Sequence, residues 1–136
     1  MLDQGNEFAL GERRLAPQDC EYLRQILARV GDKWTIVVLD ILGDRCMRFN
    51  DLHRSIAGIS QRMLVVTLRH LERDGLLART VYATVPPRVE YKLSERGHAL
   101  RHFLEQMGAW ALIHRHAIDE SRRCFDLNNK RPGNPS

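Results

Sequence analysis

Long hydrophobic segments are absent from this sequence of 136 residues. No apolar run approaches the roughly 20 residues that a helix needs to cross a membrane, so we expect no membrane partner. The first residues also lack a basic stretch followed by an apolar one, which is the pattern of a secretory signal. We therefore expect a cytoplasmic protein. Hydrophobic residues make up 43% and charged residues 28%, which is typical of a single globular domain.

Cysteine is scarce, and the three cysteines do not form a recognisable set. Cys20, Cys46 and Cys124 are an odd number and include no Cys-x-x-Cys pair. In a cytoplasmic protein this pattern argues against a disulfide framework and against a structural zinc site.

Motifs of catalysis and cofactor binding are also missing. The sequence contains no glycine-rich phosphate loop and no pairing of a nucleophile with a base, so we expect neither an enzyme nor a cofactor. His98, His102 and Glu105 share one face of an expected helix at a spacing that would suit zinc. That face lies opposite the apolar stripe, and no further ligand is near in sequence, so we expect no metal site.

Lysine is rare among the basic residues. Of the 21 basic side chains, 18 are arginines and three are lysines, and the net charge is +4. Residues 44–92 carry nine basic and five acidic side chains, whereas residues 1–43 carry five and seven. Arginine suits two-pronged contacts to phosphate and guanine, so the middle of the chain is a candidate for nucleic-acid binding. A GC-rich genome would also enrich arginine.

Apolar periodicity predicts a mainly helical chain. The expected helices span residues 18–30, 33–42, 51–57, 61–74 and 94–123. Asp32, Asn50 and Ser60 precede three of these helices and are expected N-caps. The helix over 33–42 is apolar nearly all round, so we expect it at the centre of the core.

The order of these elements predicts a winged helix-turn-helix. The helices over 51–57 and 61–74 are short and separated by a few residues that include Gly58. Residues 77–83 and 89–93 then have strand composition, and a basic, proline-containing loop over 84–88 joins them. We expect a mainly α (α+β) fold with a two-stranded wing and a long C-terminal dimerisation helix.

The second helix of the motif has two different faces. Leu64, Leu68 and Leu71 form an apolar stripe, and the opposite side carries Arg62, Val66, Arg69 and Arg73. Arginine can pair with guanine, glutamine with adenine, and valine can contact a thymine methyl group. The candidate DNA-binding residues of this helix and its cap are Ser60, Gln61, Arg62, Val66 and Arg69. A solvated basic face is the alternative interpretation.

Three further arginines are candidates for DNA contacts outside this helix. Arg88 follows Pro86 and Pro87 at the tip of the wing loop, where it could reach a phosphate or a narrow minor groove. Arg48 and Arg54 flank the first helix of the motif and could bind phosphates. Ion pairs with Asp51 or Glu90 are an equally good interpretation of these arginines.

Several sequence segments together carry a family resemblance. Cys20 is followed by GDKWT at 31–35, RFNDL at 48–52, GISQRML at 58–64, LRHLERDGLLAR at 68–79 and PPRVEYKLS at 86–94. This order resembles the HxlR-type winged helix-turn-helix transcriptional regulators, in the wider MarR-like group, over about residues 20–112. The resemblance implies a bacterial cytoplasmic homodimer that binds operator DNA and has no enzyme activity.

The resemblance also makes Cys20 a candidate redox sensor, because some members sense electrophiles or oxidants through a cysteine at this place. Family members often have proline after it, whereas Glu21 follows here, and a neighbouring carboxylate disfavours the thiolate. A small buried residue near the dimer interface is the alternative. Any small-molecule or electrophile effector stays unidentified.

The last expected helix carries more apolar surface than a small core needs. Leu100, Leu104, Met107, Ala111 and Ile118 recur at helical spacing, and Phe103 and Trp110 widen the stripe. We expect one part of it to meet a second copy of the chain. The candidate dimer-interface residues are Tyr22, Leu23, Ile26, Phe103, Met107 and Trp110. One intramolecular core is the alternative.

These expectations combine into one hypothesis. Residues 1–16 are expected to be a flexible arm, residues 17–127 the DNA-binding and dimerisation domain, and residues 128–136 a disordered tail. The chain is expected to bind a pseudo-palindromic site in double-stranded DNA as a homodimer. The alternative is a winged helix that binds another protein and has no specific DNA partner.

Overall fold

The structure is a computed structural model that describes residues 9–10 and 13–130. The chain divides into two compact units, residues 1–98 and 99–136. The helices are α1 (Pro17–Val30), α2 (Lys33–Leu42), α3 (Phe49–Ser55), α4 (Gln61–Arg73), α5 (Glu95–Ile113) and α6 (Arg115–Asn129). The strands are β1 (Ala9–Leu10), β2 (Arg13–Arg14), β3 (Met47–Arg48), β4 (Leu77–Tyr82) and β5 (Arg88–Leu93).

Helix α2 lies at the centre of the first unit, as its apolar composition predicts. It packs against α1, α3, α4 and β5. Its N-cap is Asp32, whose carboxylate accepts a hydrogen bond from the backbone N–H of Trp34 at 3.1 Å. Val38, Leu39 and Leu42 are fully buried, whereas Ile36 is 36% exposed, so one side of the helix faces out of the core.

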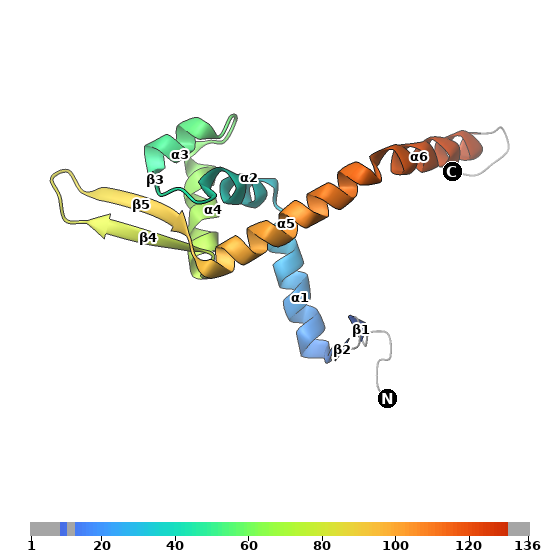
Figure 1. Ribbon diagram of the computed structural model, residues 1–136, viewed down its shortest axis with the longest axis horizontal. Coiled ribbons are helices and arrows are strands. Elements are labelled where there is room, and N and C mark those ends of the chain that lie inside the picture. Colours follow the sequence, from blue (N-terminus) through green and yellow to red (C-terminus); the bar gives the residue numbers. More distant parts are fainter. Residues whose placement is uncertain (1–8, 11–12, 131–136) are drawn as a thin grey trace. The chain divides into compact units, whose positions relative to one another are not determined.

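Helices α3 and α4 form the helix-turn-helix (Figure 1). Ser60 caps α4 as expected, because its Oγ accepts a hydrogen bond from the backbone N–H of Met63 at 3.0 Å. The expected cap at Asn50 is wrong. Helix α3 begins at Phe49, after Arg48 in extended conformation and without a side-chain cap. Asn50 is therefore the second residue of the helix.

The sheet has three antiparallel strands, in the order β3-β5-β4. Strands β4 and β5 form the expected wing, with Leu77 opposite Leu93 and Tyr82 opposite Arg88. The expectation of two strands missed β3, in which Met47 pairs with Tyr91 and Arg48 with Glu90. Strand β3 attaches the start of α3 to the wing, so the helix-turn-helix and the wing share one sheet.

The ends of the chain differ in part from the expected arm and tail. Residues 9–10 and 13–14 pair as a short antiparallel hairpin, and residues 1–8 and 11–12 lie outside the described residues. Helix α6 continues to Asn129, two residues past the expected end of the domain. Residues 131–136 of the expected tail lie outside the described residues.

The expected single C-terminal helix is interrupted. His114 leaves the helical conformation with ψ near 3°, and it separates α5 from α6. The ring of His114 lies 4.7 Å from that of Trp110. Backbone hydrogen bonds continue on both sides, from His114 N–H to the carbonyl of Trp110 and from Ile118 N–H to the carbonyl of His114.

Candidate nucleic-acid interface

Helix α4 presents the two faces that its sequence predicts. Leu64, Leu68 and Leu71 are each at most 2% exposed. Gln61, Arg62, Val66, Arg69 and Arg73 are all exposed. Thr67 was missed as part of the buried face. It is 2% exposed, and its hydroxyl donates to the carbonyl of Met63 at 2.9 Å, which satisfies this buried polar group within the helix.

The turn between α3 and α4 is held by local contacts. Gly58 has φ of +83°, a conformation that favours glycine. A ring nitrogen of His53 lies 3.0 Å from the carbonyl oxygen of Ile59. Ile56 and Ile59, which precede and follow Gly58 in the sequence, are both buried. These contacts fix the direction in which α4 leaves the turn, and so fix the position of its exposed first turn.

The end of α4 is anchored to the start of α5. The hydroxyl of Ser94 donates to the carbonyl of Gly75 at 2.6 Å and accepts from the N–H of Gly97 at 3.1 Å. A Cβ at position 97 would lie 1.9 Å from the carbonyl oxygen of Leu76, so this close approach requires glycine. Arg96 adds a hydrogen bond to the carbonyl of Asp74 at 3.1 Å.

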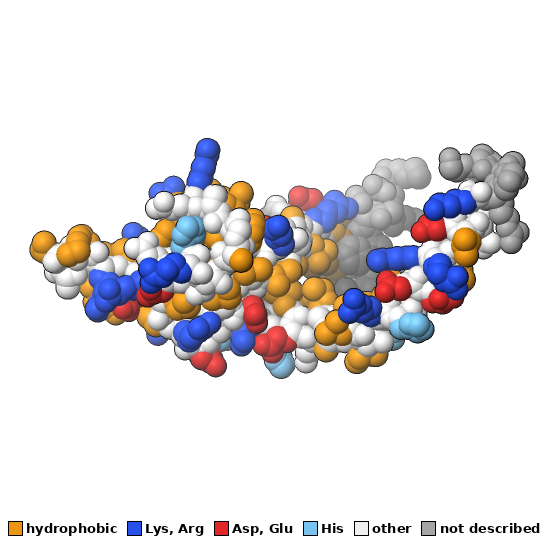
Figure 2. All heavy atoms as spheres, turned by 90° about the horizontal axis from the view of Figure 1, so that it is seen from above, with side chains coloured by type: hydrophobic (Ala, Val, Ile, Leu, Met, Phe, Trp, Pro, Cys, Tyr) orange, Lys and Arg blue, Asp and Glu red, His pale blue; other side chains and the backbone are white. Residues whose placement is uncertain are grey.

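Arg88 does not lie at the tip of the wing. It is the first residue of β5, its guanidinium lies 4.3 Å from the ring of Tyr82, and its Nε lies 3.4 Å from Oε1 of Glu90. The exposed tip is instead apolar, and Val85 there is fully exposed. Figure 2 shows hydrophobic side chains at this loop end, at the left of the view, and Lys and Arg side chains to their right. The ion pair with Glu90, one of the two interpretations of Arg88, is therefore formed.

Glu90 has a second contact, with Cys46. The thiol of Cys46 donates to Oε2 of Glu90 at 3.3 Å. Partial burial and then the hydrogen bond and negative charge of Glu90 raise the pKa of Cys46, and Lys92 and Arg88 oppose this effect. Local sequence patterns do not indicate this contact, because the two residues are 44 positions apart.

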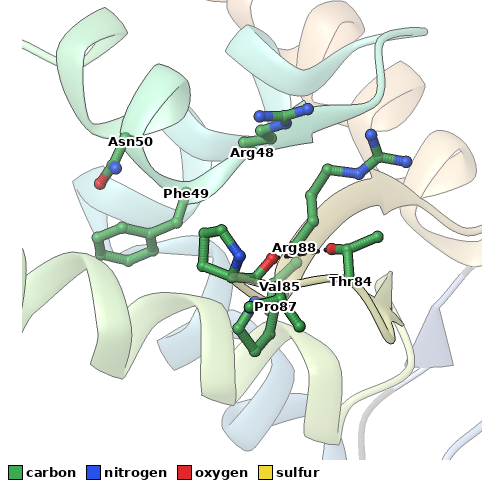
Figure 3. A pocket seen from close by; sticks show the side chains of 9 residues that line it. Arg48, Phe49, Asn50, Thr84, Val85, Pro87 and Arg88 are labelled. Atoms are coloured by element: carbon green, nitrogen blue, oxygen red, sulfur yellow. Dashed lines mark hydrogen bonds between the residues drawn. The ribbon is translucent and has the colours of Figure 1, made fainter.

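Arg48 and Arg54 differ in their surroundings. Arg54 forms an ion pair with Asp51 on α3, as the alternative interpretation held. Arg48 is exposed and lies beside a pocket of about 580 Å³, which we call the wing pocket. The residues that line the wing pocket are Arg48, Phe49, Asn50, Thr84, Val85, Pro86, Pro87, Arg88 and Val89 (Figure 3).

Cys20 is buried, at 2% exposed, within α1. A reactive cysteine needs access to solvent, so the sulfur of Cys20 is shielded from electrophiles in this conformation. Cys46 and Cys124 are both exposed.

The candidate dimer residues lie on helices with much exposed apolar surface. On α1, Tyr22 is 65% exposed, and Leu23 and Ile26 are half-buried. On α5, the candidates Phe103, Met107 and Trp110 are between 47% and 58% exposed. The expected interface omitted further exposed apolar residues, namely Leu27, Leu112, Ile113, Phe125 and Leu127.

Among residues 9–10 and 13–130, no group of three or more His, Cys, Asp or Glu side chains is arranged to hold a metal ion. No helix in that part of the chain is long and apolar enough to cross a membrane.

Comparison with known proteins identifies the family. The model of the HxlR-like helix-turn-helix family matches residues 29–119, which is more than half of the chain. The chain belongs to the HxlR-like helix-turn-helix family. It is thus a DNA-binding transcriptional regulator of the helix-turn-helix type.

Relatives and solved structures agree with this assignment to the HxlR-like family. The chain is 37% identical over 109 residues to the HTH-type transcriptional regulator YtfH of Escherichia coli, covering 80% of this chain and 79% of YtfH. It is 42% identical over 99 residues to an HTH-type transcriptional regulator of Methanothermobacter thermautotrophicus, covering 71% of this chain and 76% of that regulator. The structure of HypR, described as a redox regulator in its reduced form, matches with a TM-score of 0.64 and 38% identity. The match covers 72% of this chain and 97% of the HypR chain.

Proposed function

We propose that this HxlR-like protein binds a pseudo-palindromic operator in double-stranded DNA as a homodimer, in the cytoplasm. Helix α4 enters the major groove, and the wing contacts the DNA backbone. The observation that carries the proposal is the division of α4, in which three leucines are buried while Gln61, Arg62, Val66 and Arg69 are exposed. A helix oriented in this way offers its first turn to base edges.

The candidate DNA-binding residues of α4 and its N-cap have definite roles in this proposal. Arg62 and Gln61 contact base edges, and Val66 packs against a thymine methyl group. Arg69, two turns further on, binds backbone phosphate. The Oγ of Ser60 already accepts a hydrogen bond as the N-cap, but its O–H can still donate to a phosphate.

The dimer follows from the exposed apolar residues of α1 and α5. Large apolar side chains exposed in a group mark an interface, and a second copy of the chain is the partner that a two-fold operator requires. Such a dimer places two copies of α4 about 34 Å apart, one turn of DNA.

Regulation through Cys20 is part of the proposal, supported by the likeness to HypR, which is described as a redox regulator. We expect Cys20→Ser to keep DNA binding and to abolish its release by diamide. Equal release of the mutant and the unmutated protein would assign Cys20 to packing alone.

The test of DNA binding has two stages. Selection from a random duplex pool by the purified protein should yield one sequence with two-fold symmetry. Fluorescence anisotropy with that duplex should then show affinity that falls steeply with salt, because each phosphate contact releases counterions. If no salt-sensitive binding is seen at low ionic strength, the proposed function is wrong.

A further inference from the structure

The wing pocket combines two guanidinium groups with an apolar wall. Arg48 comes from β3 and Arg88 from β5, and among the described residues that line the pocket none is acidic. Figure 3 shows both guanidinium groups toward the upper side of the view, with Phe49 and Pro87 below them. Such a surface suits a ligand that is anionic on one side and apolar on the other.

The strand register explains why the two arginines share this place. Arg48 lies opposite Glu90 in the β3–β5 pair, and residues opposite each other in antiparallel strands point to the same face. Arg88 lies two residues before Glu90 on β5, so it shares that face too. Glu90 therefore stands between two cations, and its side chain is only 19% exposed.

The contact between Arg88 and Glu90 is incomplete. The Nε of Arg88 lies 3.4 Å from the carboxylate, yet within the described chain this buried nitrogen has no hydrogen-bond partner. An ion pair without an aligned hydrogen bond is weaker than a two-pronged one. An anion that forms aligned hydrogen bonds can therefore displace Glu90 from the guanidinium of Arg88 at a small cost in free energy.

The wing loop itself offers little for reading bases. Thr84, Val85, Pro86 and Pro87 carry no charge, and the two prolines have no backbone N–H to donate. The hydroxyl of Thr84 already donates to the carbonyl of Pro86 at 2.8 Å. The loop thus presents apolar surface beside the cations rather than hydrogen-bond donors at its tip.

We propose that the wing pocket seats one sugar–phosphate strand of the operator, with a phosphate between Arg48 and Arg88 and a deoxyribose against Phe49 and Pro87. Glu90 is the competing anion that the phosphate displaces from Arg88. This inference rests on the proposed function and adds to it a strand-binding site, a role for Phe49 and a restraint on affinity set by Glu90.

The experiment is a scan of the selected operator duplex with single methylphosphonates, each of which removes one phosphate charge. At one phosphate in each half-site, the substitution should weaken the unmutated protein by about tenfold. The same substitution should cost Arg88→Ala and Arg48→Ala less than it costs the unmutated protein, because one of the two cations is already lost. It should change the affinity of the double variant by less than about twofold. Arg62→Ala is the matched control and should keep the full effect at that phosphate.

Two further variants test the other parts of the site. Glu90→Gln should tighten binding to operator and random duplex alike and make the salt dependence steeper. Phe49→Ala should weaken both duplexes and leave the salt dependence unchanged, since it removes an uncharged contact.

The outcomes separate this inference from the proposed function. If Arg62→Ala still alters base preference but no phosphate depends on Arg48 or Arg88, the pocket does not seat a strand while the DNA-binding function stands. If poly-glutamate binds as tightly as duplex and with the same dependence on Arg88, the pocket accepts anions in general and the strand assignment is wrong. If the unmutated protein does not bind DNA, both proposals are contradicted.

Discussion

The side chain of Arg29 donates a hydrogen bond from Nε to the carboxylate of Asp74 at 2.8 Å. Arg29 belongs to the last turn of α1 and Asp74 follows the last residue of α4, so this ion pair joins a candidate dimer helix to the candidate DNA-binding helix. Both side chains are about three-quarters buried, with 22% and 26% exposed. The residues are 45 positions apart, and no local sequence pattern indicates the contact.

This ion pair should stabilise the first unit more than exposed pairs do. We expect Arg29→Ala to lower the free energy of unfolding by about 1–2 kcal/mol, because partial burial limits screening by solvent. Arg24→Ala is the control, since its pair with Glu21 is exposed, and it should cost less than about 0.5 kcal/mol. Urea unfolding measures both. An equal loss in the two variants would contradict a special role for Arg29.

The two faces of α4 can be separated by stability alone. Leu64 is fully buried, so Leu64→Ala should lower the free energy of unfolding by about 2–5 kcal/mol through lost contacts and a cavity. Val66 is 39% exposed on the other face, and Val66→Ala should change the free energy of unfolding by about 0.5 kcal/mol or less. Thermal unfolding of both proteins measures the contrast. Similar losses would mean that α4 is rotated from the orientation described.

Much of this fold could be predicted because the signals are local. Asp32 and Ser60 each precede an apolar period and cap the helix that follows, and the leucines of α4 recur at helical spacing. Local patterns of this kind depend only on residues a few positions apart.

The missed features depend on distant residues or on weak signals. Strand β3 is two residues long, too short to show alternation, and it forms only because Met47 and Arg48 meet β5. That pairing places Arg48 in extended conformation and moves the start of α3 ahead of Asn50. The break at His114 has no proline or glycine to mark it, and the ion pair of Arg88 depends on side-chain placement.

Truncating the exposed apolar stripe of α5 should weaken the proposed dimer. Trp110→Ala combined with Met107→Ala should raise the dimer dissociation constant by at least about tenfold, since aromatic side chains dominate interfaces. Operator affinity should fall in parallel. Glu105→Gln, on the opposite face of the same helix, is the control and should leave both unchanged. Sedimentation of the unmutated protein as a monomer would show that the interface assignment is wrong.

The contact with Glu90 should slow the reaction of Cys46 with alkylating agents. Because the pKa of Cys46 is raised, the reactive thiolate is less populated at neutral pH and increases as the pH rises. In a Cys20→Ser, Cys124→Ser background, Glu90→Gln should lower that pKa and shift the rate profile with iodoacetamide toward lower pH. An unchanged profile would mean that Glu90 does not act on this thiol.

The central claim is that the first turn of α4 reads bases, and it is tested most directly through Arg62. The measurement is the affinity of unmutated protein and Arg62→Ala for the selected operator, for operators changed at each position, and for random duplex. We expect Arg62→Ala to lose about 1–3 kcal/mol on the operator and to relax preference at one base pair in each half-site, with little loss on random duplex. If the variant loses the same affinity for the operator and for random duplex, Arg62 binds a phosphate, and α4 does not read the base sequence through this residue.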